Sequence, residues 1–389
     1  LYDRAFEILY TQALDSAWRT RRRESAALTR EAAAEMAAGR DAAARQRLET
    51  AIDLDPDNPA ALYNLALLAL RDGATDPDLA DFERVISLTY KSGGSDMLEL
   101  RARALTSLGV IYQRQGRSDD AEQSFLEATR TDPQEATAWV RLGRLQMDAG
   151  RQTEAITALQ KAHALRPDDS QVTIALTTAL SQTGRAAQAA ATLHAALGQH
   201  PNDAEMWHQL AGIERLRDQP STAIDAARRA IDADPENRQG VALRSAILLS
   251  EIYLQAEDPA AAHAAANLAL GWERSSADAW TALGRAQSVA DQPASAAASF
   301  GRAAELDPDS VDRQLTLGDS LVANRQLPQA EAAYLRALTL DPEAAMATEK
   351  LQAVRERITN QRAIVSGKTR APRPIAPKKI GLEFAGIDY

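Results

Sequence analysis

The chain contains no cysteine and no long apolar run, and each of these two absences excludes a class of protein or site. Aromatic residues are also few. Without cysteine there can be no disulfide bond, no thiolate metal site and no cysteine nucleophile. A membrane-spanning helix needs a run of about 18 apolar residues or more, and no stretch of this sequence approaches that length. Alanine is abundant instead, which favours closely packed helices. Arginine far outnumbers lysine, a bias that we attribute to a GC-rich bacterial genome.

Signatures of catalysis and of cofactor binding are also missing. The sequence has no glycine-rich phosphate loop and no G-x-S-x-G nucleophile elbow. Its histidines lie far apart or at spacings that do not suit zinc, with no carboxylate to complete a site; they are His163, His194, His200, His208 and His263. We therefore predict that the protein is not an enzyme and holds neither a metal nor a cofactor.

The formal net charge of the 389 residues is −10, and it is unevenly distributed. Residues 366–389 hold five basic and two acidic groups, a charge of +3, which leaves −13 for residues 1–365. A body this acidic disfavours nucleic acid, whose phosphates require a basic surface. It is compatible with a soluble scaffold and with basic partners, so we predict a protein or peptide partner and no nucleic acid.

The chain begins at Leu1 rather than at methionine. We interpret this start as the result of a removed leader or of a trimmed chain, with no signal peptide left to decide between the two. The location therefore stays open, and we favour an exported or periplasmic location in a bacterium over a cytoplasmic one.

A 34-residue period organises most of the sequence. Pro133, Pro167, Pro201 and Pro235 are each 34 residues apart, as are Pro308 and Pro342. Within residues 102–135, apolar or small residues recur at helical spacing in two groups, namely Leu105, Leu108, Gly109 and Tyr112, and then Ala121, Phe125 and Ala128. A polar break at Gln115–Arg117 separates the groups, which predicts two antiparallel helices and a stop. One such pair cannot bury its apolar face alone, so neighbouring pairs must complete it.

Three further positions recur in the same register. Small residues mark two predicted close approaches between helices: glycine at 109, 143, 284 and 318, and alanine at 121, 155, 189, 223, 296 and 330. Tryptophan recurs at 139, 207 and 280, where we expect each ring to pack between helices. The ensemble resembles the tetratricopeptide repeat family, whose repeat length and W-L-G-Y…A-F…P pattern match it over residues 25–344. The resemblance implies a right-handed α-solenoid that recognises other proteins.

The predicted fold is therefore all-α, with nine two-helix repeats. Glycines and serine at Lys91–Ser95 cannot extend a helix cheaply, so we expect a loop to interrupt the repeats there. A second interruption should lengthen or offset the helix that follows it. The predicted segments are a capping or docking helix at 1–24, the solenoid at 25–344 with interruptions at 93–101 and 238–242, a capping helix at 345–365, and a basic proline-rich spacer with an apolar peptide-like tail at 366–389.

The resemblance also implies a binding groove, because in this family the first helix of each repeat lines the concave face. Mapped onto this chain, the groove is mainly apolar in its first half and polar with an acidic excess in its second. The predicted groove residues are Tyr63, Leu67, Leu70, Val110, Val140, Arg144, Met147, Ile174, His208, Arg215, Glu251, Arg285 and Asp319. Contact across a tightly wound superhelix is an alternative explanation for the apolar half. The lysine/asparagine clamp of chaperone-binding relatives is absent, which argues against a co-chaperone.

The tail carries much apolar surface for a segment beside a soluble body, in Ile380, Leu382, Phe384, Ile387 and Tyr389. We predict a noncatalytic scaffold that binds an extended peptide in its groove, with the tail of another copy as the leading ligand. Joining unlike surfaces head to tail would give a homo-oligomeric ring or filament. The alternative is an adaptor subunit of a bacterial envelope, secretion or enzyme complex that binds a foreign partner.

Overall fold

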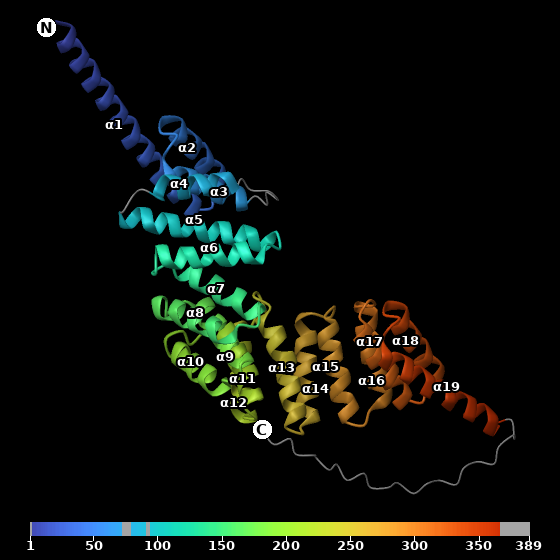
Figure 1. The fold of residues 1–389 in the computed structure, drawn as a ribbon. Coiled ribbons are helices and arrows are strands. Elements are labelled where there is room, and N and C mark those ends of the chain that lie inside the picture. Colours follow the sequence, from blue (N-terminus) through green and yellow to red (C-terminus); the bar gives the residue numbers. More distant parts are fainter. Residues whose placement is uncertain (1, 72–78, 91–93, 366–389) are drawn as a thin grey trace. The chain divides into compact units, whose positions relative to one another are not determined.

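The computed structural model describes residues 2–71, 79–90 and 94–365, and within them every regular element is an α-helix (Figure 1). This confirms the all-α fold class. The chain divides into two compact units, unit 1 (Leu1–Pro201) and unit 2 (Asn202–Tyr389). Unit 1 contains α1 (Tyr2–Ala37), α2 (Asp41–Leu54), α3 (Pro59–Arg71), α4 (Leu79–Tyr90), α5 (Ser95–Arg114), α6 (Ser118–Thr131), α7 (Ala136–Asp148), α8 (Gln152–Leu165), α9 (Ser170–Gln182) and α10 (Ala186–Gln199). Unit 2 contains α11 (Ala204–Leu216), α12 (Pro220–Ala233), α13 (Val241–Gln255), α14 (Pro259–Trp272), α15 (Ala277–Val289), α16 (Pro293–Leu306), α17 (Val311–Ala323), α18 (Leu327–Leu340) and α19 (Ala345–Val365).

Consecutive helices pack in pairs, such as α5 on α6 in unit 1 and α11 on α12 in unit 2. Most turns inside a pair place one residue in the left-handed region. In unit 1 that residue is glycine, for example Gly116 with φ of 74°. In unit 2 it is a larger residue, such as Asp218 with φ of 55°, and three of the helices that follow these turns begin with proline, at 220, 259 and 293. Proline fits there because the first helical N–H has no intrahelical partner.

The recurring small residues lie where the two helices of a pair approach most closely, as predicted. A Cβ added at Gly109 would lie 2.6 Å from Phe125 Cε1, and one added at Gly284 would lie 2.8 Å from Phe300 Cδ1. Carbon atoms in contact normally stay about 3.5–4.0 Å apart, so a side chain at either position must displace the ring. The six recurring alanines are all fully buried.

The tryptophans of the repeats pack between helices, which confirms their structural assignment. Trp139 contacts the core that contains Phe125 and Leu142, and its indole Nε1 donates to Pro133 O at 3.0 Å. Trp280 repeats this bond to Arg274 O at 2.9 Å, and Trp207 is 9% exposed.

The loop predicted over 93–101 is wrong from Ser95 onward. Residues 95–101 form the first turns of α5, which has 20 residues instead of the 13 of α7 or α9. Asp96 lies in the first turn, where an acidic residue suits the helix macrodipole. Leu100 packs against the core around Tyr63 and Phe82, so burial supports the extra turns. The insertion therefore lengthens a helix.

At the second interruption, residues 238–240 form a turn and residues 241–242 lengthen α13. The buried Asp234 carboxylate holds this turn, because Oδ2 accepts from Val241 N at 3.0 Å. Gly240 precedes α13 with φ of 72°. The prediction of a lengthened helix is confirmed here.

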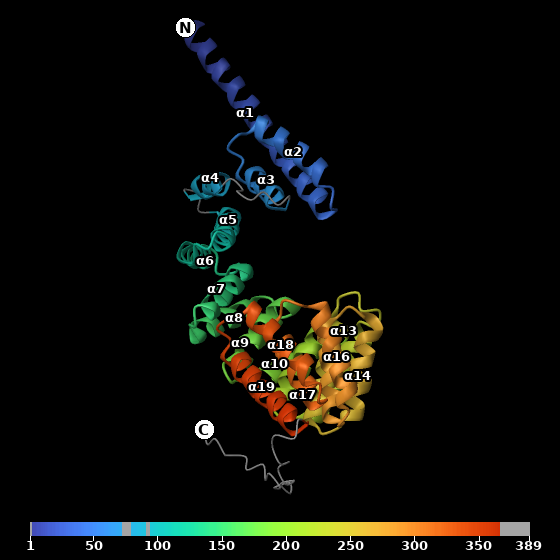
Figure 2. The same ribbon diagram turned by 90° about the vertical axis from the view of Figure 1, so that its right-hand side faces the viewer.

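The predicted separate helix at 1–24 is instead continuous with the first helix of the repeats, since α1 runs from Tyr2 to Ala37. No glycine or proline interrupts this stretch, so nothing stops the helix. Figures 1 and 2 show α1 extending past α2, and residues 15–24 are all exposed. These residues do not cap the first repeat.

At the other end, α19 covers the last helix pair of unit 2. Leu351 and Val354 of α19 are buried against a core that includes Leu327 and Tyr334 of α18. This packing agrees with the predicted terminal cap at 345–365. The predicted spacer and tail at 366–389 lie outside the described residues.

Candidate functional site

Unit 1 contains a groove of about 540 Å³ along α3, α5 and α7. Four of the predicted groove residues line it together: Tyr63, Leu67, Leu70 and Val110. The remaining lining residues are Glu99, Arg103, Thr106, Ser107, Glu135, Thr137, Arg141 and Arg166. We call this surface the unit 1 groove. It combines an apolar strip with a charged lining of three arginines and two glutamates.

The apolar strip arises from helical spacing on α3. Tyr63, Leu67 and Leu70 follow one another at intervals of four and three residues, so they lie on one face of the helix. Tyr63 is 5% exposed and contacts the Phe82 ring edge-on at a centroid distance of 5.9 Å. Leu67, Leu70 and Val110 are only partly buried. The buried tyrosine fixes the strip, and the partly buried residues leave apolar surface available to a ligand.

The arginines of the groove differ in how they are neutralised. Arg103 stacks over Tyr63, with its Cζ 5.1 Å from the ring centroid, and pairs with Glu99 at 3.7 Å. Arg166 lies 4.0 Å from Asp169. Arg141, on α7, is partly buried and has no hydrogen bond or ion pair with any described residue. Burial lowers the pKa of the Arg141 guanidinium below its ordinary value, and the like charges of Arg144 and Arg114 lower it further.

The sequence prediction named Arg144 but missed Arg141. A signal for it exists, because the two arginines are three residues apart on α7 and therefore share a face. The neighbours of Arg141 at three and four residues, in both directions, include no carboxylate. An arginine without a local carboxylate on a predicted groove helix is a candidate ligand contact.

The other predicted residues of unit 1 lie outside the unit 1 groove. Val140 and Met147 on α7 and Ile174 on α9 are partly buried, and Arg144 is exposed. None of the four lines the hollow that holds Tyr63 and Leu67. The apolar surface that the structure brings together is therefore shorter than the predicted one.

In unit 2, three predicted residues line a second hollow of about 390 Å³: His208, Glu251 and Arg285. Burial lowers the pKa of His208, and the nearby Arg244 lowers it further. The His208 ring Nδ1 lies 2.9 Å from Ser245 Oγ. The hollow is thus lined by groups that already contact one another.

The acidic residues of this surface are neutralised within unit 2. Salt bridges join the first helices of successive pairs; they are Arg244–Glu205 at 2.6 Å, Arg285–Glu251 at 3.2 Å, Arg313–Asp278 at 2.8 Å and Lys350–Asp319. We call these the inter-repeat pairs. Arg215 also lies 3.8 Å from Glu251, and Asp319 accepts from the Tyr334 hydroxyl. The acidic excess predicted for this half is therefore largely paired.

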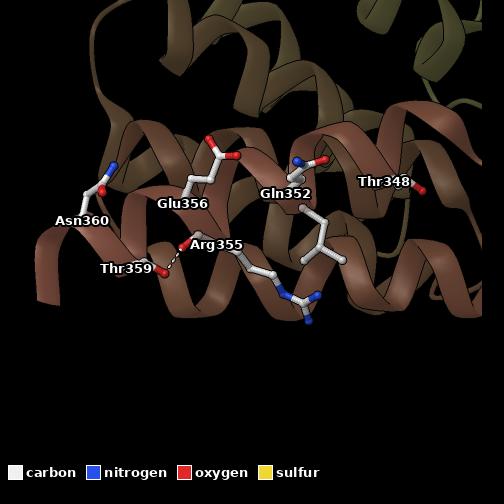
Figure 3. A pocket seen from close by; sticks show the side chains of 7 residues that line it. Thr348, Gln352, Arg355, Glu356, Thr359 and Asn360 are labelled. Atoms are coloured by element: carbon white, nitrogen blue, oxygen red, sulfur yellow. Dashed lines mark hydrogen bonds between the residues drawn. The ribbon is translucent and has the colours of Figure 1, made fainter. Parts of the chain in front are cut away.

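A further hollow, of about 710 Å³, lies on α19 and is a poor candidate (Figure 3). It is lined by Thr348, Leu351, Gln352, Arg355, Glu356, Thr359 and Asn360, all from one helix. Arg355 is paired with Glu331 at 2.7 Å, and the Thr359 hydroxyl donates to Arg355 O. An open face of a single helix offers a ligand no opposing wall, so its size does not make it a site.

The described residues offer neither a metal site nor a membrane span. No group of three histidine, aspartate or glutamate side chains there could hold a metal ion. In the same part of the chain, no helix is both long enough and apolar enough to cross a membrane.

Comparison with known families identifies repeats in both units of the chain. Models described as "Tetratricopeptide repeat" match residues 106–170, 146–213 and 315–351, and a model described as "TPR repeat" matches residues 33–73. Among curated proteins, DnaJ homolog subfamily C member 3 of Mus musculus is 32% identical over 100 residues, or 26% of this chain. The match spans only 18% of the length of that relative.

Two solved structures are similar in fold to this chain. A tetratricopeptide repeat protein from Parabacteroides merdae has a TM-score of 0.51 at 12% identity, over 65% of this chain and 98% of that one. Yeast Tom70 has a TM-score of 0.50 at 12% identity, over 94% of this chain and 97% of that one. At such low identity the likeness shows the fold alone.

Proposed function

Because this chain belongs to the tetratricopeptide repeat family, we propose that it is a noncatalytic scaffold whose unit 1 groove binds an extended peptide. One observation carries the proposal: Leu67, Leu70 and Val110 form a partly exposed apolar strip on a rigid base that includes the buried Tyr63. A preformed apolar surface binds without the cost of ordering it first. To bind to this strip, a peptide needs only apolar side chains at regular spacing.

The ligand that we propose is the segment 380–389 of another copy. Its apolar residues Ile380, Leu382 and Phe384 alternate with other residues, so in an extended chain they point to one side. Exchange between copies joins a tail to a groove, two unlike surfaces, and builds a ring or an open filament.

The test uses the full-length chain and measures its mass in solution across a range of concentrations. We expect the parent protein to form assemblies whose mass rises with concentration. The double substitution Leu382→Asp, Phe384→Asp in the tail should reduce the mass to that of a monomer. The matched control is Ile375→Asp, the same kind of change within the spacer, which should assemble like the parent.

The groove side is tested in the same assay by Leu67→Asp. The control is Leu216→Asp, because Leu216 is a 66% exposed helical leucine in unit 2. We expect only Leu67→Asp to prevent assembly, with the helix content of both variants unchanged by circular dichroism. A parent protein that stays monomeric at all concentrations would refute self-assembly. Equal behaviour of the two leucine variants would refute the groove.

A further inference from the structure

Positive charge without an ion pair among the described residues lies in the unit 1 groove, at Arg141, and beside it, at Arg114 and Arg144. The inter-repeat pairs of unit 2 give the basic groups of its first helices a carboxylate partner. In unit 1, Arg114 on α5 and Arg141 and Arg144 on α7 have no hydrogen bond or ion pair among the described residues. This occurs in a body with a formal charge of −13 over residues 1–365. The body as a whole has more carboxylates than basic groups, so it is only around these three arginines that carboxylate partners are missing.

These three arginines form one cluster. Arg141 and Arg144 are three residues apart on α7 and share a face. Arg114 ends α5, which packs against α7. Burial lowers the pKa of Arg141, and the like charges of Arg144 and Arg114 lower it further. Arginine stays charged at neutral pH, so the repulsion remains in the folded protein. An anion bound between these groups would relieve it.

The cluster borders the apolar strip, since Arg141 lines the same hollow as Leu67, Leu70 and Val110. A ligand that occupies the hollow therefore meets apolar side chains and an unpaired guanidinium in one short stretch. Resting on the function proposed above, we propose that the unit 1 groove selects peptides that carry a carboxylate side chain between apolar residues. The carboxylate binds at the cluster of Arg114, Arg141 and Arg144.

The segment 380–389 has this chemistry. Glu383 stands between Leu382 and Phe384, and Asp388 stands between Ile387 and Tyr389. The segment contains no basic residue, so its side chains carry a charge of −2. The five basic groups lie upstream, in the spacer. The charge of the segment complements the unit 1 groove, whereas that of the spacer does not.

Binding of two labelled peptides to the full-length protein tests the proposal. The peptide IGLEFAGIDY has the native sequence of 380–389, and IGLQFAGINY replaces both carboxylates by amides of the same shape. Residues 380–389 of the full-length protein compete with both labelled peptides for the groove to the same extent, so the comparison between the peptides is unaffected. A charge-assisted hydrogen bond contributes enough to affinity that we expect the acidic peptide to bind about tenfold more tightly or better.

Arg141→Gln should remove this preference, and its matched control is Arg130→Gln. Arg130 is an exposed arginine of α6 with no ion pair among the described residues, so its substitution should leave the preference intact. Raising the ionic strength to about 1 M shortens the Debye length to about 3 Å and should narrow the difference between the peptides. Because Arg141→Gln removes like-charge repulsion, its unfolding midpoint should match or exceed that of the parent.

The outcomes separate the two proposals. If neither peptide binds, the proposed function fails and this inference fails with it. If both peptides bind equally well to the parent protein, peptide binding stands and recognition of the carboxylate is refuted. A preference that survives Arg141→Gln would place the carboxylate elsewhere and overturn the assignment, and so would a preference that Arg130→Gln removes.

Discussion

Gly109→Ala should destabilise the protein even though alanine is the better helix former. An alanine Cβ at this position would lie 2.6 Å from Cε1 and 2.8 Å from Cδ1 of Phe125. Phe125 is fully buried, so its ring has no free space to enter. Overpacking of this kind costs about 1–3 kcal/mol, and the higher helix propensity of alanine returns about 1 kcal/mol. We expect a net loss of up to about 2 kcal/mol.

A double-mutant cycle tests whether the ring causes the loss. Phe125→Ala alone should cost about 3–5 kcal/mol as a large core deletion. In the Gly109→Ala background it should cost about 1–3 kcal/mol less, because Phe125→Ala then also removes the clash between the ring and the alanine at position 109. The repeat that contains Ala211 already has this combination, since alanine also occupies the equivalent of position 125, at Ala227, and both are fully buried.

The assay is urea unfolding followed by circular dichroism, with Gly212→Ala as the control. Gly212 lies within α11, and nothing comes within 4 Å of a Cβ added there. This control should therefore stabilise the protein by up to about 1 kcal/mol. Repeat proteins can unfold in parts, so hydrogen exchange should place the effect of Gly109→Ala in α5 and α6. A stabilising Gly109→Ala, or additive effects in the cycle, would refute the close-approach argument.

Three further predictions follow from the packing and the titration. Trp139→Ala should cost about 3 kcal/mol, at the low end for a large core deletion because the ring is only partly buried; a cost below about 1 kcal/mol in urea unfolding would contradict its placement. Limited proteolysis should cut beside Gly94 before it cuts within α6 to α11, as mass spectrometry of the fragments would show. Because the pKa of His208 is lowered in the folded protein, the unfolded chain binds a proton at this residue at a higher pH than the folded protein does. Stability should therefore fall as pH drops below about 6.5, and His208→Gln should reduce that fall in thermal unfolding between pH 7 and 5.

The helix pairs could be predicted because the information for them is local and repeated. Pro133 and its equivalents mark the end of each pair, and Gly109 with Phe125 marks the crossing of the two helices. The same local reasoning failed at residues 95–101, where a glycine-rich start suggested a loop. Residues that follow it, such as Leu100, gain burial against a neighbouring pair. That burial depends on tertiary structure and has no signature in a short window.

The groove was predicted in part, for a different reason. Spacing on one helix identifies Tyr63, Leu67 and Leu70 as a single strip, and the structure agrees. Whether a charged residue is free depends on partners in a neighbouring repeat; the partner of Arg244, for example, is Glu205, 39 residues earlier in the chain. The sequence alone therefore indicated an acidic excess in unit 2 that the structure shows to be paired, and it missed the unpaired Arg141 in unit 1.

The inter-repeat pairs have a mechanical consequence for unit 2. They connect α11, α13, α15, α17 and α19 in series, so any bending that spreads these helices must stretch them. Each is partly exposed to solvent, and such a pair is worth at most about 1 kcal/mol, so it can break and re-form singly under load. No comparable salt bridge connects α3, α5, α7 and α9 among the described residues of unit 1. Unit 2 should therefore behave as a spring whose stiffness falls as salt screens its charges, whereas the stiffness of unit 1 should depend on apolar packing.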